Sequence, residues 1–270
     1  MKLIIKYIFY ILLFIFNLSF AFSAEFNGKF VQGSFILGKT EPGSTVLIDD
    51  RKIRVTKDGF FAFGLDRDRK NDVIIKVKKN KKIKIYEKKI IKREYKIQRI
   101  DGLPPKQVTP PPEVYERIKK DNVLIGKARS IDTAYDFFKN NFIYPIDKYI
   151  ITGVYGSQRI LNGKPRRPHY GIDFHAPEGT PVKAMMDGEV TLSESDMYFT
   201  GGTIIFDHGH GISTLYMHMK DINVKKGQKV KKGDVVGTLG QSGRATGPHL
   251  DIRLNWFEVK LDPATILNLN

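Results

Sequence analysis

Short runs of alternating apolar and polar residues, separated by glycine-containing turns, fill most of this 270-residue chain. Turns at residues 41–44 and 57–59 divide runs rich in β-branched and aromatic residues. The same texture returns from residue 144 onward, with strand-like runs at residues 188–191, 202–206 and 213–216. Strands prefer such residues at a period of two, so the pattern predicts a mainly β protein.

The chain divides into regions of different composition. We expect a signal peptide at residues 1–23, a small β-sandwich-like accessory domain at 24–100, a proline-rich linker and helix at 101–143, and an antiparallel β-sheet or barrel-like domain at 144–270. Residues 101–112 hold the prolines and should be extended and stiff. Apolar spacing predicts a helix over residues 113–129 and a second over 133–140.

The N-terminus has the pattern of a secretory signal peptide. Lys2 and Lys6 precede an unbroken apolar run from Ile8 to Phe16, and Ala21 and Ser23 supply the two small residues of a cleavage site after Ser23. An uncleaved membrane anchor is the alternative, although the apolar segment is short for a span of ~20 residues. The protein is therefore expected to be exported, in the periplasm or associated with the cell envelope.

The net charge of +16 suggests an anionic partner. Export argues against nucleic acid as that partner. Residues 76–99 carry twelve basic and two acidic side chains, and alternating apolar residues around Asn80-Lys81 predict a hairpin with a lysine-rich outer face. These lysines either dock the protein on an anionic envelope polymer or simply keep an exposed strand edge solvated. Membrane contact is expected only if the signal segment is retained.

The chain contains no cysteine, which excludes a disulfide framework, a thiol nucleophile and cysteine-ligated metals. Any metal must be held by histidine and carboxylate. The six histidines all lie in the last 102 residues, at positions 169, 175, 208, 210, 218 and 249. The chemistry is therefore expected in the C-terminal domain.

Three segments combine histidine with carboxylate or with a polar strand face. Alternation places His249 and Asp251 on one face of a strand, and places Thr214, Tyr216 and His218 together on another. A further segment holds His169 and Asp173, four residues apart. An extended strand would separate that pair by ~13 Å, so a bend at Gly171 is needed to bring them to one metal ion. Histidine with carboxylate suits a catalytic Zn²⁺.

The remaining polar candidates have simpler explanations. His208 and His210 are expected in a glycine-rich turn whose polar groups bind water, and His175 to lie beside the site or at the surface. Arg253 could hold a substrate carboxylate or form a salt bridge with a nearby acidic residue. Trp256 is expected in the core.

Residues 153–263 resemble the lysostaphin/LytM-type zinc metalloendopeptidases, which cut peptide cross-links in peptidoglycan. The resemblance rests on motifs in the family's order and spacing: His169-x-x-x-Asp173, Ala176-Pro177-x-Gly179-Thr180-Pro181, Gly188-x-Val190, Asp207-His208-Gly209, Tyr216-x-His218 and Gly247-Pro248-His249. It implies one Zn²⁺ per chain, with His169 and Asp173 as ligands. It further implies that His218 and His249 are catalytic, orienting the attacking water and stabilising the oxyanion.

One position departs from the family pattern. The second histidine of the family's terminal His-x-His motif, its third zinc ligand, is Asp251 here. A His169/Asp173/Asp251 site is chemically reasonable, but two carboxylates neutralise the charge of Zn²⁺ and weaken it as a Lewis acid. The expected function is an exported peptidoglycan endopeptidase. The alternative is a non-catalytic LytM-like scaffold that binds peptidoglycan or activates another cell-wall hydrolase.

Overall fold

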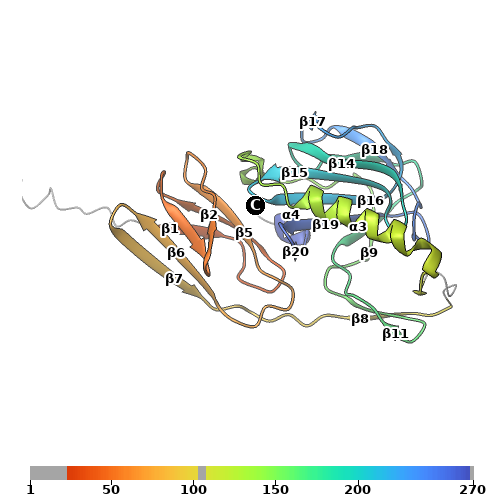
Figure 1. Cartoon of the computed structure of the whole chain (residues 1–270), viewed down its shortest axis with the longest axis horizontal. Coiled ribbons are helices and arrows are strands. Elements are labelled where there is room, and N and C mark those ends of the chain that lie inside the picture. Colours follow the sequence, from red (N-terminus) through yellow and green to blue (C-terminus); the bar gives the residue numbers. More distant parts are fainter. Residues whose placement is uncertain (1–22, 103–107, 268–270) are drawn as a thin grey trace, which may run out of the picture.

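Strands dominate the computed structural model of the chain, which describes residues 23–102 and 108–267 (Figure 1). The predicted mainly β fold is confirmed. Most of the signal segment, residues 1–22, and residues 103–107 of the linker lie outside the described residues. Among the helices of the described part, none has the length and apolar character needed to cross a membrane.

Two small antiparallel sheets form the N-terminal part of the molecule. One holds β1 (Ala24–Asn27), β2 (Phe35–Thr40) and β5 (Phe60–Gly64), and the other holds β3 (Thr45–Ile48), β4 (Arg51–Ile53), β6 (Val73–Lys79) and β7 (Lys82–Lys88). Aromatic rings pack between the sheets: Phe26 on β1 lies edge-on to Tyr86 on β7, with ring centroids 5.2 Å apart. This arrangement is that of a small sandwich.

The lysine-rich hairpin forms as predicted, from β6 and β7 joined at Asn80-Lys81. Val73, Ile75 and Val77 on β6 are fully buried, whereas most side chains of β7 are exposed. Ile83 and Ile85 on β7 are each 61% exposed. The hairpin therefore presents a surface on which lysine alternates with exposed isoleucine.

A ten-stranded sheet forms the C-terminal part, and it is open, without closing into a barrel. Its main path runs β17-β14-β15-β16-β19-β12-β9, with β13, β18 and β20 attached. The bounds are β9 (Ile150–Gly153), β12 (Ile172–His175), β13 (Pro181–Lys183), β14 (Gly188–Met197), β15 (Gly201–Gly209), β16 (Ile212–Ile222), β17 (Lys229–Val230), β18 (Val235–Leu239), β19 (Leu250–Trp256) and β20 (Val259–Leu261). Short helix α4 (Ala264–Leu267) follows β20.

A third sheet links the two parts. The chain leaves the N-terminal sandwich through β8 (Ile97–Ile100), which pairs in parallel with β10 (Gln158–Leu161) of the hairpin that β10 forms with β11 (Lys164–Pro165). The linker region thus returns to the C-terminal part as a strand before it reaches the helix.

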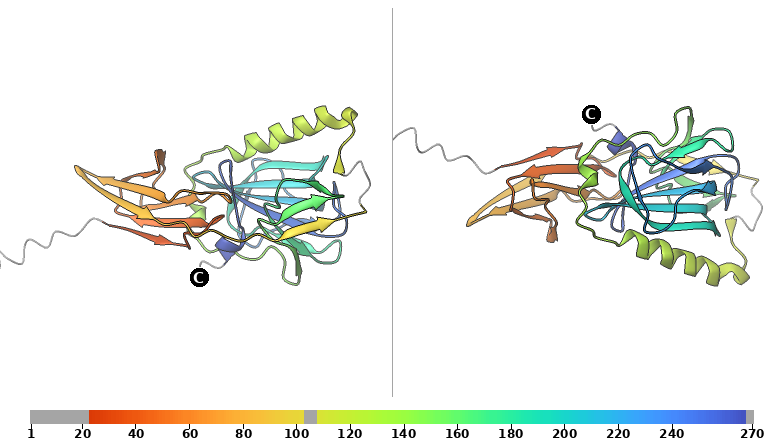
Figure 2. Two further views of the ribbon diagram at one scale, coloured as in Figure 1. Left: turned by 90° about the horizontal axis from the view of Figure 1, so that it is seen from below. Right: turned by 90° about the horizontal axis from the view of Figure 1, so that it is seen from above.

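The predicted first helix is present as the short 3-10 turn η1 (Pro112–Val114) followed by α3 (Tyr115–Arg129). Figure 2 shows α3 lying along one face of the large sheet. Leu124, Ile125 and Ala128 pack there against Ile205 and the apolar residues of a small second core. The helix therefore covers part of one sheet face.

The second predicted helix, over residues 133–140, is wrong: only the single turn η2 (Phe137–Lys139) forms. The segment bonds instead to the end of β15. The amide of His210 donates to the carbonyl of Thr133, and the backbone of Tyr135 lies so close to Gly209 that a Cβ there would be 1.7 Å from its oxygen. Phe138 is buried against the ring of His210. Tertiary contacts outweigh the local helical periodicity here.

One hydrophobic core runs through both parts of the molecule. Phe35 and Phe63 of the sandwich belong to the same cluster as Leu254 and Leu261 of the large sheet. Polar contacts cross the same boundary, including the ion pair between Arg93 and Asp262 at 2.7 Å. The two parts are therefore packed together as one body.

Candidate metal centre and active-site cavity

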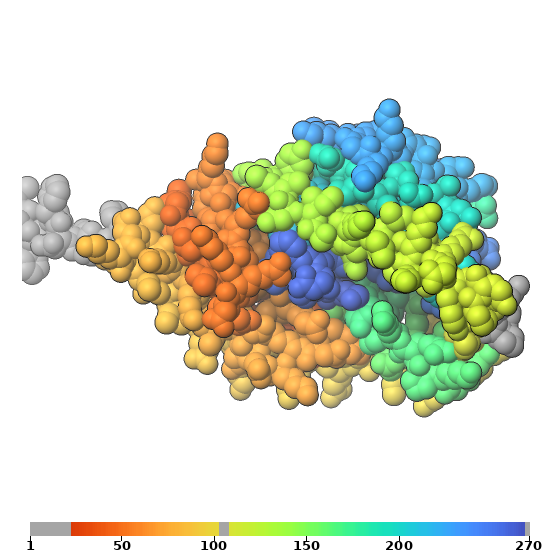
Figure 3. All heavy atoms as spheres, viewed as in Figure 1, coloured from red at the N-terminus to blue at the C-terminus, as the bar shows by residue number. Residues whose placement is uncertain are grey.

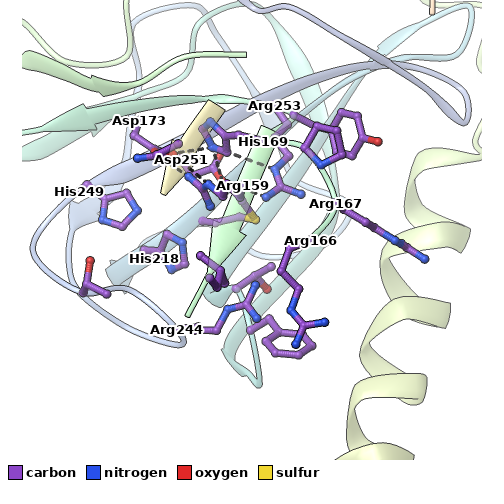
Figure 4. Close-up of a pocket in the computed structure, with 18 of the residues that line it drawn as sticks. Arg159, Arg166, Arg167, His169, Asp173, His218, Arg244, His249, Asp251 and Arg253 are labelled. Atoms are coloured by element: carbon purple, nitrogen blue, oxygen red, sulfur yellow. Dashed lines mark hydrogen bonds and ion pairs between the residues drawn. The ribbon is translucent and has the colours of Figure 1, made fainter. Parts of the chain in front are cut away.

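His169, Asp173 and Asp251 converge beside the neighbouring strands β12 and β19 of the large sheet. One potential ligand atom from each lies within 4.8 Å of the others, and all three residues are buried. His169 Nε2 is 3.1 Å from Asp173 Oδ1 and 3.3 Å from Asp251 Oδ2. Figure 4 shows the three side chains meeting in a pocket. The structure thus brings together the three residues that the sequence predicted to bind metal.

The sheet register and two glycines produce this convergence. Asp173 on β12 lies directly opposite Asp251 on β19, so both carboxylates leave the same face. The chain bends at Gly171, as predicted, and returns His169 to them. A Cβ on Gly171 would lie 2.1 Å from Asp251 Oδ1, and one on Gly153 would lie 2.1 Å from Asp173 Oδ2. Larger side chains at these two positions would displace the carboxylates.

A ring of outer contacts orients the cluster. The Nδ1–H of His169 donates to the carbonyl oxygen of Val154 at 3.3 Å, which leaves Nε2 directed at the carboxylates. Arg159 contacts Asp173 at 3.2 Å, and Arg253 contacts Asp251 at 3.0 Å. Burial opposes the charge on Asp251, but Arg253 and His169 outweigh it and hold the pKa of that carboxyl well below its usual range.

The donor set fits a Zn²⁺ ion. His169 Nε2 carries at most one proton and cannot serve both carboxylates, and Asp173 Oδ1 is left buried without a hydrogen bond. An imidazole nitrogen and two carboxylate oxygens that face one point, with outer partners already in place, are typical of a catalytic zinc site. The presence of Asp251 in place of the family's histidine does not disturb this fit, because the Asp251 carboxylate reaches the cluster from the strand position that the motif predicts.

In the metal-free protein, we expect His169 to make folding less favourable as the pH rises. Burial lowers its pKa, but Asp251 and Asp173 outweigh burial and raise the pKa from 6.5 to about 8. The resulting stabilisation is fully present below pH 6.5 and is lost as the pH rises through 8, for a total of about 2 kcal/mol. Urea unfolding with a chelator at pH 6 and pH 9 measures it. His169→Gln should abolish this difference, and an unchanged difference in the variant would contradict the assignment.

His218 and His249 lie beside the cluster with their rings 4.6 Å apart. The Nδ1–H of His218 donates to the carbonyl oxygen of Ser242 at 2.9 Å, and that of His249 donates to the carbonyl oxygen of Gly247 at 2.9 Å. In the neutral rings Nε2 is therefore a proton acceptor. Burial lowers the pKa of His218 to about 4, so its imidazole is uncharged at neutral pH.

The orientation of the His218 side chain relative to its strand neighbours differs from the one that the sequence pattern predicted. The expectation that Thr214, Tyr216 and His218 share one strand face is wrong. Tyr216 points into the main core, where its hydroxyl accepts a hydrogen bond from the amide of Met185, whereas Leu215 and Met217 line the same cavity as His218. His218 has a left-handed backbone, with φ +65°, which reverses the alternation at this residue.

A cavity of about 1020 Å³ opens in front of the cluster. Its walls come from the sheet, from the β10–β11 hairpin, from the loop before β19, and from α3 with the residues just before it. In Figure 3, α3 lies across the front of the C-terminal part. In the part of the chain that the structure describes, seven basic side chains line this cavity: Arg129, Arg159, Arg166, Arg167, Arg244, Arg253 and Lys260. Apart from Arg253, the sequence interpretation missed these, although the Arg166-Arg167 pair just before Pro168-His169 was a signal.

The other candidates have structural roles. His208 is not in a water-filled turn: it is buried on β15, and its ring contacts the carbonyl of Asp187 at 2.7 Å and the hydroxyl of Thr214 at 2.8 Å. His210 is also buried. His175 is exposed and bonds to the carbonyl of Pro248. Arg253 forms the salt bridge to Asp251 already described. Trp256 is in the core, as predicted.

Comparison with known proteins agrees with this geometry. The model of peptidase family M23 matches residues 167–263. The chain is 41% identical over 113 residues to peptidoglycan DD-endopeptidase ShyA of Vibrio cholerae, a stretch that makes up 41% of this chain and 26% of that protein. It is 41% identical over 91 residues to DD-carboxypeptidase/endopeptidase Mpg of Neisseria meningitidis, covering 33% of this chain and 21% of that protein.

These relatives are much longer than the matched stretch, which spans about a quarter of their length. The whole-chain fold has a counterpart in a solved structure from Pseudomonas aeruginosa that bears the name peptidase M23. The TM-score is 0.69 at 24% identity, over 90% of this chain and 96% of that one. This likeness in fold extends beyond the residues that the family model matches.

Proposed function

We propose that the protein is an exported zinc metalloendopeptidase that hydrolyses peptide cross-links in peptidoglycan. The observation that carries the proposal is the buried His169/Asp173/Asp251 cluster in an M23 domain, with two imidazoles beside it in one cavity. Relatives named peptidoglycan DD-endopeptidases support the substrate class. In this proposal residues 1–23 are the signal peptide, 24–100 an accessory domain, 101–143 the linker and helix, and 144–270 the peptidase domain.

His169, Asp173 and Asp251 would hold the ion. Bound Zn²⁺ would supply Lewis acidity toward water and the scissile carbonyl. The protein's own contribution is proton transfer and orientation. Neutral His218 presents Nε2 as the acceptor for a proton of the attacking water, with its ring fixed by Ser242. His249, whose ring is 4.6 Å away, is placed to stabilise the oxyanion.

Digestion of purified peptidoglycan tests the function. We expect the zinc-loaded protein to convert cross-linked peptide dimers to monomers, measured by chromatography and mass spectrometry of the products. Chelator should stop the reaction and added Zn²⁺ should restore it. Intact dimers after incubation with zinc-loaded protein would reject the endopeptidase. Peptidoglycan binding without cleavage would favour the alternative, a non-catalytic scaffold.

We further propose that the β6–β7 hairpin docks on an anionic envelope polymer. The exposed side chains of β7 and the excess of lysine in residues 76–99 support this. Changing Lys82 and Lys84 to glutamate should weaken binding to an anionic envelope polymer, either teichoic acid or lipopolysaccharide, at least tenfold at low salt, because ion pairing is lost. Cosedimentation with the polymer measures the affinity. The same change at Lys225 and Lys226, on an exposed turn of the C-terminal part, is the control. Equal weakening by both pairs would contradict a hairpin-specific site.

A further inference from the structure

The active-site cavity carries far more positive than negative charge. Among the described residues, its lining includes seven basic side chains and two carboxylates, those of Asp173 and Asp251. Both carboxylates are already engaged, by His169 and by the guanidinium groups of Arg159 and Arg253. The described lining therefore carries an excess of positive charge, to which a bound metal ion would add.

Arg244 lies in the middle of this excess. It is on the loop between β18 and β19 that also carries Ser242 and His249, and its guanidinium packs over the ring of Phe199, 4.4 Å from the centroid. Its amide donates to the carbonyl of Phe199, which fixes the loop beside the catalytic imidazoles. Burial and three neighbouring arginines, at positions 159, 253 and 166, all lower its pKa.

Arg166 approaches the same region from the β10–β11 hairpin. Its Nη2 donates to the carbonyl of Val108 at 2.9 Å and to the hydroxyl of Thr109 at 3.2 Å, so the residues before α3 orient it. Its Nε is buried without a hydrogen-bond partner. Figure 4 shows Arg166 and Arg244 together, on the same side of the cluster as His218.

Guanidinium groups that converge in a partly buried cavity repel one another, and their charge is stabilised when an anion binds between them. A carboxylate suits them best, because its two oxygens match the planar fork of arginine donors. We infer that Arg166 and Arg244 form a subsite for a carboxylate of the substrate, next to the scissile peptide bond. The inference rests on the proposed function in one respect, that the ligand is a peptide.

Calorimetric titration tests the subsite without relying on cleavage. The probe is a cross-linked peptide dimer released from peptidoglycan, compared with the same dimer whose carboxylates have been converted to methylamides. The His218→Asn variant, loaded with zinc, is used so that the probe is not consumed. We expect the methylamide form to bind about 10- to 100-fold more weakly, since charge-assisted hydrogen bonds are lost.

We then add Arg244→Gln or Arg166→Gln to the His218→Asn variant. Each change should weaken binding of the carboxylate form by about tenfold or more, so that the protein binds the two forms nearly equally. Arg117→Gln is the matched control, because Arg117 lies on α3 outside the cavity and pairs with Asp196. It removes the same charge and should leave binding unchanged. Equal binding of the two probes, or no binding of either, would overturn the subsite. Discrimination between the probes by a protein that does not cleave peptidoglycan would uphold the subsite and reject only the endopeptidase.

Discussion

Replacing His218 with asparagine should lower kcat for peptide cross-link cleavage by about 10²- to 10⁴-fold while zinc remains bound. The reason is that asparagine offers no nitrogen lone pair to accept a proton from the attacking water. Asparagine is chosen over alanine because residue 218 has a left-handed backbone, which asparagine adopts at little cost. Release of monomers from cross-linked dimers measures the rate, and metal analysis measures the zinc.

His175→Ala is the matched control for this prediction. His175 lines the same cavity but is exposed, and its ring is bonded to a backbone carbonyl. Its loss should change the rate by no more than a few-fold. A His218→Asn protein that keeps a tenth or more of the wild-type rate, with zinc bound, would remove His218 from the proton-transfer step.

The second large effect is expected at Asp251. Asp251→Asn should lower the affinity for zinc by more than about 100-fold, because loss of a direct ligand exceeds the 10- to 100-fold that outer partners contribute. Asp251→His, which introduces the residue typical of the family at this position, should retain zinc. Competition with a chromophoric chelator measures both affinities.

Asp262→Asn controls for the loss of a buried, paired carboxylate. Asp262 is 5% exposed and pairs with Arg93 at 2.7 Å, away from the cluster. This variant should unfold at a lower temperature than wild type and still bind zinc. Full zinc occupancy of Asp251→Asn under conditions that saturate the wild type would place Asp251 outside the coordination shell.

The sequence predicted the mainly β architecture well, because strand alternation and glycine turns are local signals. The resemblance to the lysostaphin/LytM-type family also selected the residues that meet in the cluster, and strand alternation with a bend at Gly171 made their convergence reasonable. The prediction from sequence failed where long-range contacts decide. The backbone of residues 133–140 bonds to β15 in place of forming a helix, and the left-handed conformation of His218 reverses a strand pattern that appears regular.

The arginines of the cavity show a different limit. Arg159 and Arg166 come from the β10–β11 hairpin and Arg244 from the loop between β18 and β19, and nothing in their spacing indicates that they converge. Their proximity follows from the parallel pairing of β8 with β10 and from the position of the residues before α3. Charge counts along the chain placed most of the excess in the lysine-rich hairpin, and so concealed a second excess inside the cavity.

The shared hydrophobic core has a mechanical consequence. Gly64 of β5 packs closely on Leu261 of β20, so that a Cβ at residue 64 would lie 2.5 Å from the leucine side chain. The sandwich is therefore packed tightly against the last strands of the large sheet. Asp251 lies on β19, which pairs with β20. A larger side chain at the Gly64–Leu261 contact would therefore shift β20, and through the β19–β20 pair it would also shift the Asp251 carboxylate. This contact should tolerate few changes in side-chain volume.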